Sequence, residues 1–225
     1  MESGSSPIIV VSDVHLGSRH CRCELFIRFI QTMPGGTPLV LNGDIVTTHD
    51  TQHYPPRHRE ALDVLRAESF RRKVVWVRGN HDERFVMSDP GRIEFASSWH
   101  IGKQLFMAHG NDFDNVMPHN RFFIILFRLF HRVRILLGAE SIHVAQYAKR
   151  FPLLYRVLLR HVAMNAVEHA KENGYGAVAC GHTHYVEDRI QDGVRYLNTG
   201  AWTEETPYYL AVNDTAVELR PVPDS

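Results

Sequence analysis

The chain has 225 residues, a length that fits one domain with room for an appended subdomain. Lys and Arg number 25, as do Asp and Glu, so no net positive field points to a nucleic-acid partner. Three cysteines are too few, and an odd number, for a disulfide framework. Residues 1–7 show no secretion signal, and no apolar run reaches the ~18 residues of a membrane-spanning helix. We therefore expect a cytoplasmic protein, which could still bind the inner face of the cell membrane as a peripheral protein.

The first predicted element is a buried strand over residues 8–11, where four apolar, mostly β-branched residues follow one another. Asp13 and His15 come directly after it, two positions apart. In extended backbone, side chains at i and i+2 point the same way, so this carboxylate and this imidazole can face one point. The end of the strand is therefore a candidate site.

Helices and strands alternate through the next hundred residues. Apolar residues at helical spacing predict an amphipathic helix over 22–33, followed by a strand at 39–41. A second helix, 57–72, precedes a strand at 74–77, and another strand is expected at 105–108. Such alternation is typical of a parallel-rich α/β sheet.

The last third of the chain is mostly strand. We expect strands at 177–180, 194–198, 208–212 and 216–220, and Asp192-Gly193 is a strong hairpin signal. Strand–helix–strand units followed by a β-rich end indicate an α/β protein with two packed sheets and helices outside.

Five of the predicted strands end in side chains that can bind a metal. The candidate ligands are Asp13, His15, Asp44, Asn80, His109, His182 and His184. Open α/β sheets place their sites at the carboxyl ends of strands. Carboxylates, imidazoles and an amide oxygen suit Mn, Fe or Zn, and seven ligands fit two ions ~3.5–4 Å apart that share a carboxylate.

Asp44, from this set, and His81, which is not in it, have a predicted catalytic role. Asp44 is the predicted bridge between the two ions, because it stands alone after the second strand. His81 directly follows the ligand Asn80, so its side chain is expected to point elsewhere. We predict that His81 donates a hydrogen bond to a phosphoryl oxygen or protonates the leaving group.

Residues 118–172 form a predicted helical insertion, within what we otherwise expect to be a single domain, 1–225. Helices are expected up to Gly138, at about 142–150 and at about 153–172. Between residues 121 and 160 the segment carries eight Lys or Arg and one acid. It can be a basic, apolar cap that meets acyl chains, phosphate or an anionic membrane. It can equally be an ordinary insertion with an apolar face in the core and solvated arginines.

The site residues carry a family resemblance. Asp13-x-His15, Gly43-Asp44, Gly79-Asn80-His81-Asp82, His109-Gly110 and Gly181-His182-x-His184 resemble, in order, the five sequence blocks of the calcineurin-like metallophosphoesterases. The resemblance implies a four-layer α/β/β/α sandwich that holds two metal ions. It implies that one ion is bound by Asp13, His15, Asp44 and His184. It implies that the other is bound by Asp44, Asn80, His109 and His182, with His81 as the catalytic histidine.

Within that superfamily the chain is most similar to the UDP-2,3-diacylglucosamine hydrolases of lipid A synthesis. The similarity rests on residues 12–18, 109–114 and 198–202 and on the helical insertion. It implies a hydrolase with two divalent metal ions, expected to be Mn. The enzyme would cleave the pyrophosphate bond of an acylated sugar nucleotide and release UMP and 2,3-diacylglucosamine 1-phosphate. The residues expected to contact the substrate are Asn80, Arg19, Arg121 and Arg128.

Two other functions are compatible with the same motifs. The chain can hydrolyse a soluble nucleotide or another phosphodiester, with the helical segment serving only as packing. It can also be a phosphoesterase fold used as a binding module. Relatives of the latter kind have usually lost metal ligands, whereas this chain keeps all seven candidates and His81.

Overall fold

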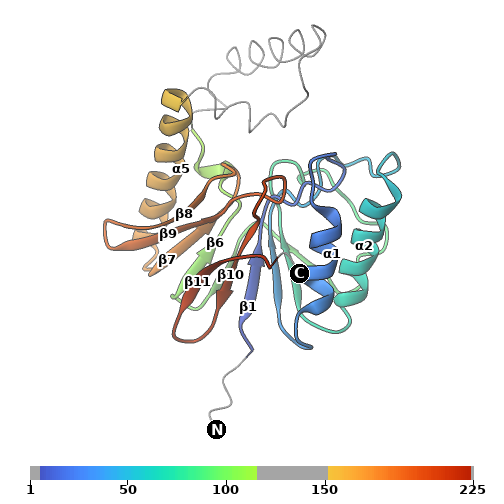
Figure 1. The fold of residues 1–225 in the computed structure, drawn as a ribbon. Helices are drawn as coiled ribbons and strands as arrows, with labels where there is room; N and C mark the ends of the chain where they lie inside the picture. Colours follow the sequence, from blue (N-terminus) through green and yellow to red (C-terminus); the bar gives the residue numbers. More distant parts are fainter. Residues whose placement is uncertain (1–5, 116–151, 224–225) are drawn as a thin grey trace, which may run out of the picture.

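Two β-sheets stack face to face between helices in the computed structural model, which describes residues 6–115 and 152–223 (Figure 1). The first sheet has six strands in the order β11 (Val217–Pro221), β10 (Tyr208–Val212), β1 (Ile8–Val11), β2 (Leu39–Asn42), β3 (Val74–Val77) and β4 (Glu94–Ala96). The second has five in the order β5 (Trp99–Ile101), β6 (Leu105–Met107), β7 (Ala177–Cys180), β9 (Val194–Thr199) and β8 (Val186–Gln191).

Helices cover the outer faces of both sheets. Helices α1 (Cys23–Thr32) and α2 (Pro56–Glu68) lie on one side in Figure 1, and α5 (Pro152–Glu172) lies on the other. Within β1, Ile9 and Val11 join the apolar cluster that contains residues of α1 and α2, whereas Val10 joins the cluster between the sheets. This alternation is the period of two of a strand with both faces buried. The predicted α/β fold with two packed sheets and outer helices is confirmed.

The parallel pairings explain why the candidate ligands gather at one end of the strands. β1 pairs with β2 and β2 with β3, all parallel, and β6, β7 and β9 form a second parallel set. The carboxyl ends of the strands in each set therefore lie together. Backbone hydrogen bonds from Asp13 N to Gly43 O and from Gly181 N to His109 O, at 2.9 and 2.8 Å, join neighbouring strand ends.

Most of the expected elements are present, and the differences have local causes. The helix expected at 57–72 ends at Glu68, because the chain turns there and directs Arg72 back into the interior. Strands β4, β5 and β8 were not predicted. β4 and β5 have three residues each, too few for a period to be visible, and β8 lies at a sheet edge with a largely polar sequence.

The expected helix at 153–172 corresponds to α5. Its residues Ala163, Ala166, Val167 and Ala170 pack on the outer face of the second sheet. This part of the expected insertion therefore forms an outer layer of the sandwich. The two other helices expected there lie outside the described residues, as do Arg121 and Arg128. Across the ranges that the structure describes, no helix has the length and apolar character needed to cross a membrane.

A buried ion pair fixes the end of α2. The side chain of Arg72 is 1% exposed, and its Nε donates a 2.7 Å hydrogen bond to Glu68 Oε2. The remaining guanidinium nitrogens donate to the carbonyl oxygens of Met33, Pro34 and Thr37, each at 3.3 Å. Arg72 thereby joins α2 to the loop between α1 and β2.

We expect Arg72→Met to lower the free energy of unfolding by about 3–5 kcal/mol, because it leaves the buried Glu68 carboxylate without its partner. The matched control is Arg71→Met, since Arg71 also pairs with Glu68 but its side chain is 65% exposed. That variant should lose no more than about 1 kcal/mol. Urea unfolding measures both, and equal losses would contradict the role given to Arg72.

Candidate metal centre

The strand ends place the candidate ligands in strained backbone. Six non-glycine residues among those described have positive φ, and five of them are candidate ligands: Asp13, His15, Asp44, His182 and His184, with φ from 52° to 65°. The left-handed region costs an L-residue roughly 1–2 kcal/mol. Strain of this kind persists where the surrounding structure enforces it, and it clusters at functional sites.

Glycines beside the candidate ligands allow the loops to approach closely. A Cβ atom at Gly181 would lie 2.1 Å from Asp13 Oδ2, and one at Gly79 would lie 2.3 Å from Asp44 Oδ1. A side chain at either position would displace a carboxylate. The glycines of these motifs therefore have a steric role in the site.

Three ligand atoms converge next to β1. Asp13 Oδ1 lies 3.2 Å from His184 Nε2 and 3.9 Å from His15 Nε2, and the two Nε2 atoms are 3.0 Å apart. All three residues are buried. The structure thus brings together residues that are up to 171 positions apart. Their ligand atoms are close enough for one cation to bind all three.

A second group forms around Asp44. Its Oδ2 atom lies 3.2 Å from His109 Nε2, and Asp13, Asp44 and His109 offer ligand atoms within 4.8 Å of one another. Asp44 also forms such a group with His15 and His81. Asp44 therefore stands between the two histidine sets, where the sequence interpretation puts the bridging ligand.

Asn80 and His182 meet at the open side of the cluster. His182 Nδ1 lies 3.2 Å from Asn80 Oδ1, and the His182 side chain is 18% exposed. The backbone N–H of His182 donates to both carboxylate oxygens of Asp13 at 3.1 Å. His182 thus contacts both halves of the candidate centre.

His81 lies at the mouth of the cluster. Its side chain is 41% exposed, and its backbone N–H donates to Asp44 Oδ1 at 2.8 Å. Nδ1 lies 2.8 Å from the carbonyl oxygen of Thr47, so Nδ1 carries the proton and Nε2 faces Asp44 Oδ2 at 3.9 Å. The ring also packs edge-on against His15, with 5.2 Å between centroids. The sequence predicts that this side chain points elsewhere than that of Asn80, and in the structure it borders His15 and Asp44.

The electrostatics of the cluster favour a bound cation. Burial raises the pKa of Asp13 and Asp44, but the charge of His109 and nearby imidazoles outweigh burial and hold both pKa values below their usual range. Burial lowers the pKa of His109, yet Asp44 and Asp13 raise it to about 10. Burial, with the charge of His184, lowers the pKa of His15 well below its usual value. Two ionised, buried carboxylates need positive charge, and a metal ion can replace the proton on His109.

The donor set fits the implied metals. It contains carboxylates, imidazole nitrogens and an amide oxygen and lacks a thiolate, which suits Mn, Fe or Zn. The buried Nε2 of His109 makes no hydrogen bond of acceptable geometry, as expected of an atom that is placed for coordination.

Asp82, for which the sequence motifs predict no separate role, organises two of the site loops. Its carboxylate is fully buried and accepts hydrogen bonds from Trp76 Nε1 at 3.0 Å, Val46 N at 3.1 Å and Gly79 N at 3.2 Å. Burial and the charge of Asp44 raise its pKa. The Gly-Asn-His-Asp motif contains Asp82, but sequence alone does not reveal that it joins the loops after β2 and β3.

The structure places Arg19, one of the predicted substrate contacts, on the loop after β1. Its side chain is exposed, with Nε 3.3 Å from His20 Nε2. Asn80, another predicted substrate contact, lies in the cluster beside His182.

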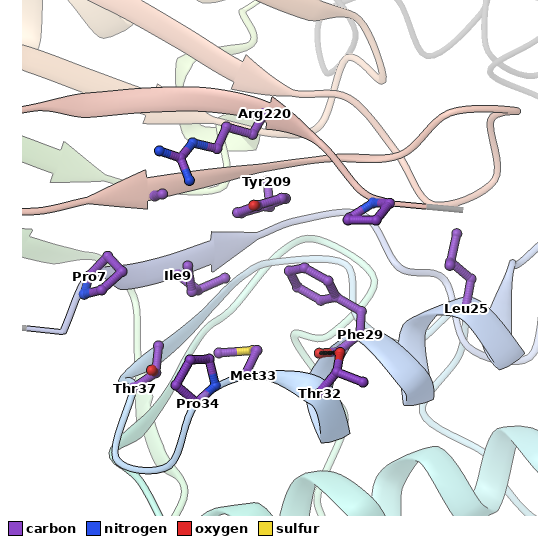
Figure 2. A pocket seen from close by; sticks show the side chains of 12 residues that line it. Pro7, Ile9, Leu25, Phe29, Thr32, Met33, Pro34, Thr37, Tyr209 and Arg220 are labelled. Atoms are coloured by element: carbon purple, nitrogen blue, oxygen red, sulfur yellow. Dashed lines mark hydrogen bonds between the residues drawn. The ribbon is translucent and has the colours of Figure 1, made fainter. Parts of the chain in front are cut away.

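A hollow of about 350 Å³ lies between α1 and the β10–β11 part of the first sheet (Figure 2). Ile9, Phe29, Met33 and Tyr209 are among the side chains that line it. None of its lining residues is a candidate ligand, so this apolar hollow is not part of the metal centre.

Two stacked sheets between helices, with carboxylates and imidazoles gathered at strand ends, form a site of the kind that can hold two metal ions for phosphoester hydrolysis. The chain matches the family model described as calcineurin-like phosphoesterase over residues 6–186. It therefore belongs to the calcineurin-like phosphoesterase family. The family resemblance read from the five motifs is confirmed at this level.

Individual relatives are distant. The chain is 24% identical over 256 residues to the DNA polymerase II small subunit of Methanothermobacter thermautotrophicus, covering 92% of this chain and 49% of that protein. The chain thus spans about half the length of this curated relative.

Solved structures of similar extent are equally distant. The phosphoesterase Yfce from E. coli is 16% identical, with 96% of this chain and 100% of that chain covered and a TM-score of 0.45. A Vps29 single mutant from Entamoeba histolytica is 17% identical, with 96% and 98% covered and a TM-score of 0.46. No functional assignment follows from likenesses of this size.

We expect Asp44→Asn to remove one of two bound metal ions and to abolish hydrolysis, because the amide cannot supply a charged ligand to both ions. Asp50→Asn is the control, since Asp50 lies on the same loop and its side chain is 50% exposed. Metal analysis of protein dialysed after loading with Mn measures the stoichiometry. Two ions per chain in the Asp44 variant would remove this residue from the bridging position.

Proposed function

We propose that the chain hydrolyses a phosphodiester or phosphoanhydride bond with two divalent metal ions held at the strand ends. The observation that carries this proposal is the convergence of carboxylate, imidazole and amide ligand atoms from five loops. The proposed ligands are Asp13, His15, Asp44, Asn80, His109, His182 and His184.

The contacts support a division of these ligands between two ions. Asp13, His15 and His184 are in mutual contact and would hold one ion with Asp44. Asp44 contacts His109, and His182 contacts Asn80, as expected of ligands to the other. When bound, two such ions acidify a water molecule and neutralise charge that develops on phosphoryl oxygens. We propose Mn as the working metal, since mixed oxygen and imidazole ligands suit it.

His81 is the proposed proton donor. Its Nδ1–H is directed to the carbonyl oxygen of Thr47, which fixes the ring and leaves Nε2 as the atom that can exchange a proton with a substrate. The side chain is 41% exposed, so a phosphoryl group at the mouth of the site can reach it.

We expect His81→Ala to keep both metal ions and to lower the hydrolysis rate about 10²–10⁴-fold, the usual contribution of a general acid or base. His53→Ala is a suitable control, because the His53 side chain is 87% exposed. Metal analysis and turnover are measured on the same samples. A His81 variant that loses metal would make His81 a ligand, an outcome compatible with its grouping with His15 and Asp44.

The proposed substrate is UDP-2,3-diacylglucosamine, cleaved at its pyrophosphate to UMP and 2,3-diacylglucosamine 1-phosphate. The resemblance at residues 12–18, 109–114 and 198–202 supports this choice. The surface of α5 supports it as well, because Arg156 and Arg160 are exposed beside Val157 and Met164, which are 47% and 42% exposed. Basic and apolar side chains together suit a substrate with phosphates and acyl chains.

Turnover of this substrate with Mn, compared with a small chromogenic phosphodiester, tests the proposal. We expect both to be hydrolysed, and we expect Arg156→Gln combined with Arg160→Gln to slow the acylated substrate about tenfold while sparing the small one. Lys171→Gln, at the other end of α5, is the control. Hydrolysis of the small diester alone would support a soluble substrate, and no hydrolysis of either with metal bound would support a binding module.

A further inference from the structure

Asp114 makes a contact with the metal centre that the sequence motifs do not assign. It follows the short helix η1 (Asn111–Phe113), is 3% exposed, and places Oδ2 2.9 Å from His182 Nε2. The other ring nitrogen of His182 lies 3.2 Å from Asn80 Oδ1. The imidazole therefore stands between a buried carboxylate on one side and a proposed metal ligand on the other.

This arrangement determines which nitrogen of His182 carries the proton. A carboxylate accepts hydrogen bonds and cannot donate one, so the Asp114 contact requires a proton on Nε2. Neutral His182 then has its lone pair on Nδ1, facing the Asn80 oxygen, which is also an acceptor. Nδ1 therefore carries the lone pair that a metal ion beside Asn80 would use.

We propose that Asp114 is a positioning residue for the second metal ion, acting through His182. It holds the imidazole in the Nε2–H form, so that Nδ1 is the coordinating atom, and it makes that nitrogen more basic. Carboxylate–histidine–metal chains of this kind orient the ring and strengthen the ligand. The inference rests on the proposed two-metal function, since it concerns one of that site's ligands.

The position of Asp114 is itself fixed by α5. Asn165 Nδ2 donates a 2.8 Å hydrogen bond to Phe113 O, and the Phe113 ring lies 5.5 Å from that of His169. The backbone N–H of Asp114 donates to Asn111 O at 3.2 Å. Helix α5 therefore holds the loop that carries Asp114, and through Asp114 it orients the ring of His182.

The test compares Asp114→Asn and Asp114→Ala with Asp112→Asn, an exposed carboxylate on the same short helix. ¹⁵N NMR of the metal-free protein reports the tautomer of His182, and His182→Gln identifies its signal. Titration with Mn measures the affinity of each ion. The asparagine variant preserves the shape of the side chain, so it remains informative if the alanine variant does not fold.

In the wild type and in the Asp112 control we expect the Nε2–H form of His182. In both Asp114 variants we expect a share of the Nδ1–H form and about 10–100-fold weaker binding of one ion, with the other unchanged. An Nδ1–H form in the wild type, or wild-type tautomer and affinity in the Asp114 variants, would overturn the inference even if the enzyme is active. Two-ion binding without hydrolysis of any phosphoester would instead reject the proposed function and leave the tautomer result intact.

Discussion

Two buried carboxylates join the two sheets and organise the metal centre. Asp13, at the end of β1, accepts the backbone N–H of His182 from the loop after β7 in the other sheet. Asp44, at the end of β2, accepts the N–H of His81 from the loop after β3, and its Oδ2 lies 3.2 Å from Nε2 of His109, which follows β6 in the other sheet. Both carboxylates are buried, and the charge of His109 holds their pKa values below the usual range, so they favour positive charge beside them. The carboxylates of Asp13 and Asp44 thus hold the loops together and also favour the binding of cations.

The rest of the sandwich makes this arrangement possible. The apolar packing between the sheets, which includes Val10, Leu105 and Leu197, holds the strand ends at a fixed separation. The residues with positive φ at those ends keep this strained conformation because the packed strands around them enforce it. Rigid strands below and close glycine contacts within the loops thus place ligand atoms before any ion binds.

Helix α5 belongs to this support as well as to the proposed substrate surface. Tyr155 donates its hydroxyl to Thr183 O at 2.7 Å, between the two histidines of the last motif. Asn165 holds the loop that carries Asp114. One face of the helix packs on the second sheet, and exposed basic and apolar residues lie on another. A substitution in α5 can therefore affect the proposed hydrolysis in two ways, by moving the metal ligands or by weakening the binding of the substrate.

The sequence by itself determined the architecture and the candidate ligands, because apolar periodicity and strand-end motifs such as Asp13-x-His15 are local signals. It missed the strands β4 and β5, which are too short to show a period of two, and the edge strand β8, whose sequence is largely polar. Tertiary structure alone decided the contact of Asp114 with His182, the buried role of Asp82, and the position of His81 at the mouth. Each depends on which loops meet in space. Local sequence patterns do not show that Asp114 and His182, 68 positions apart, lie in contact.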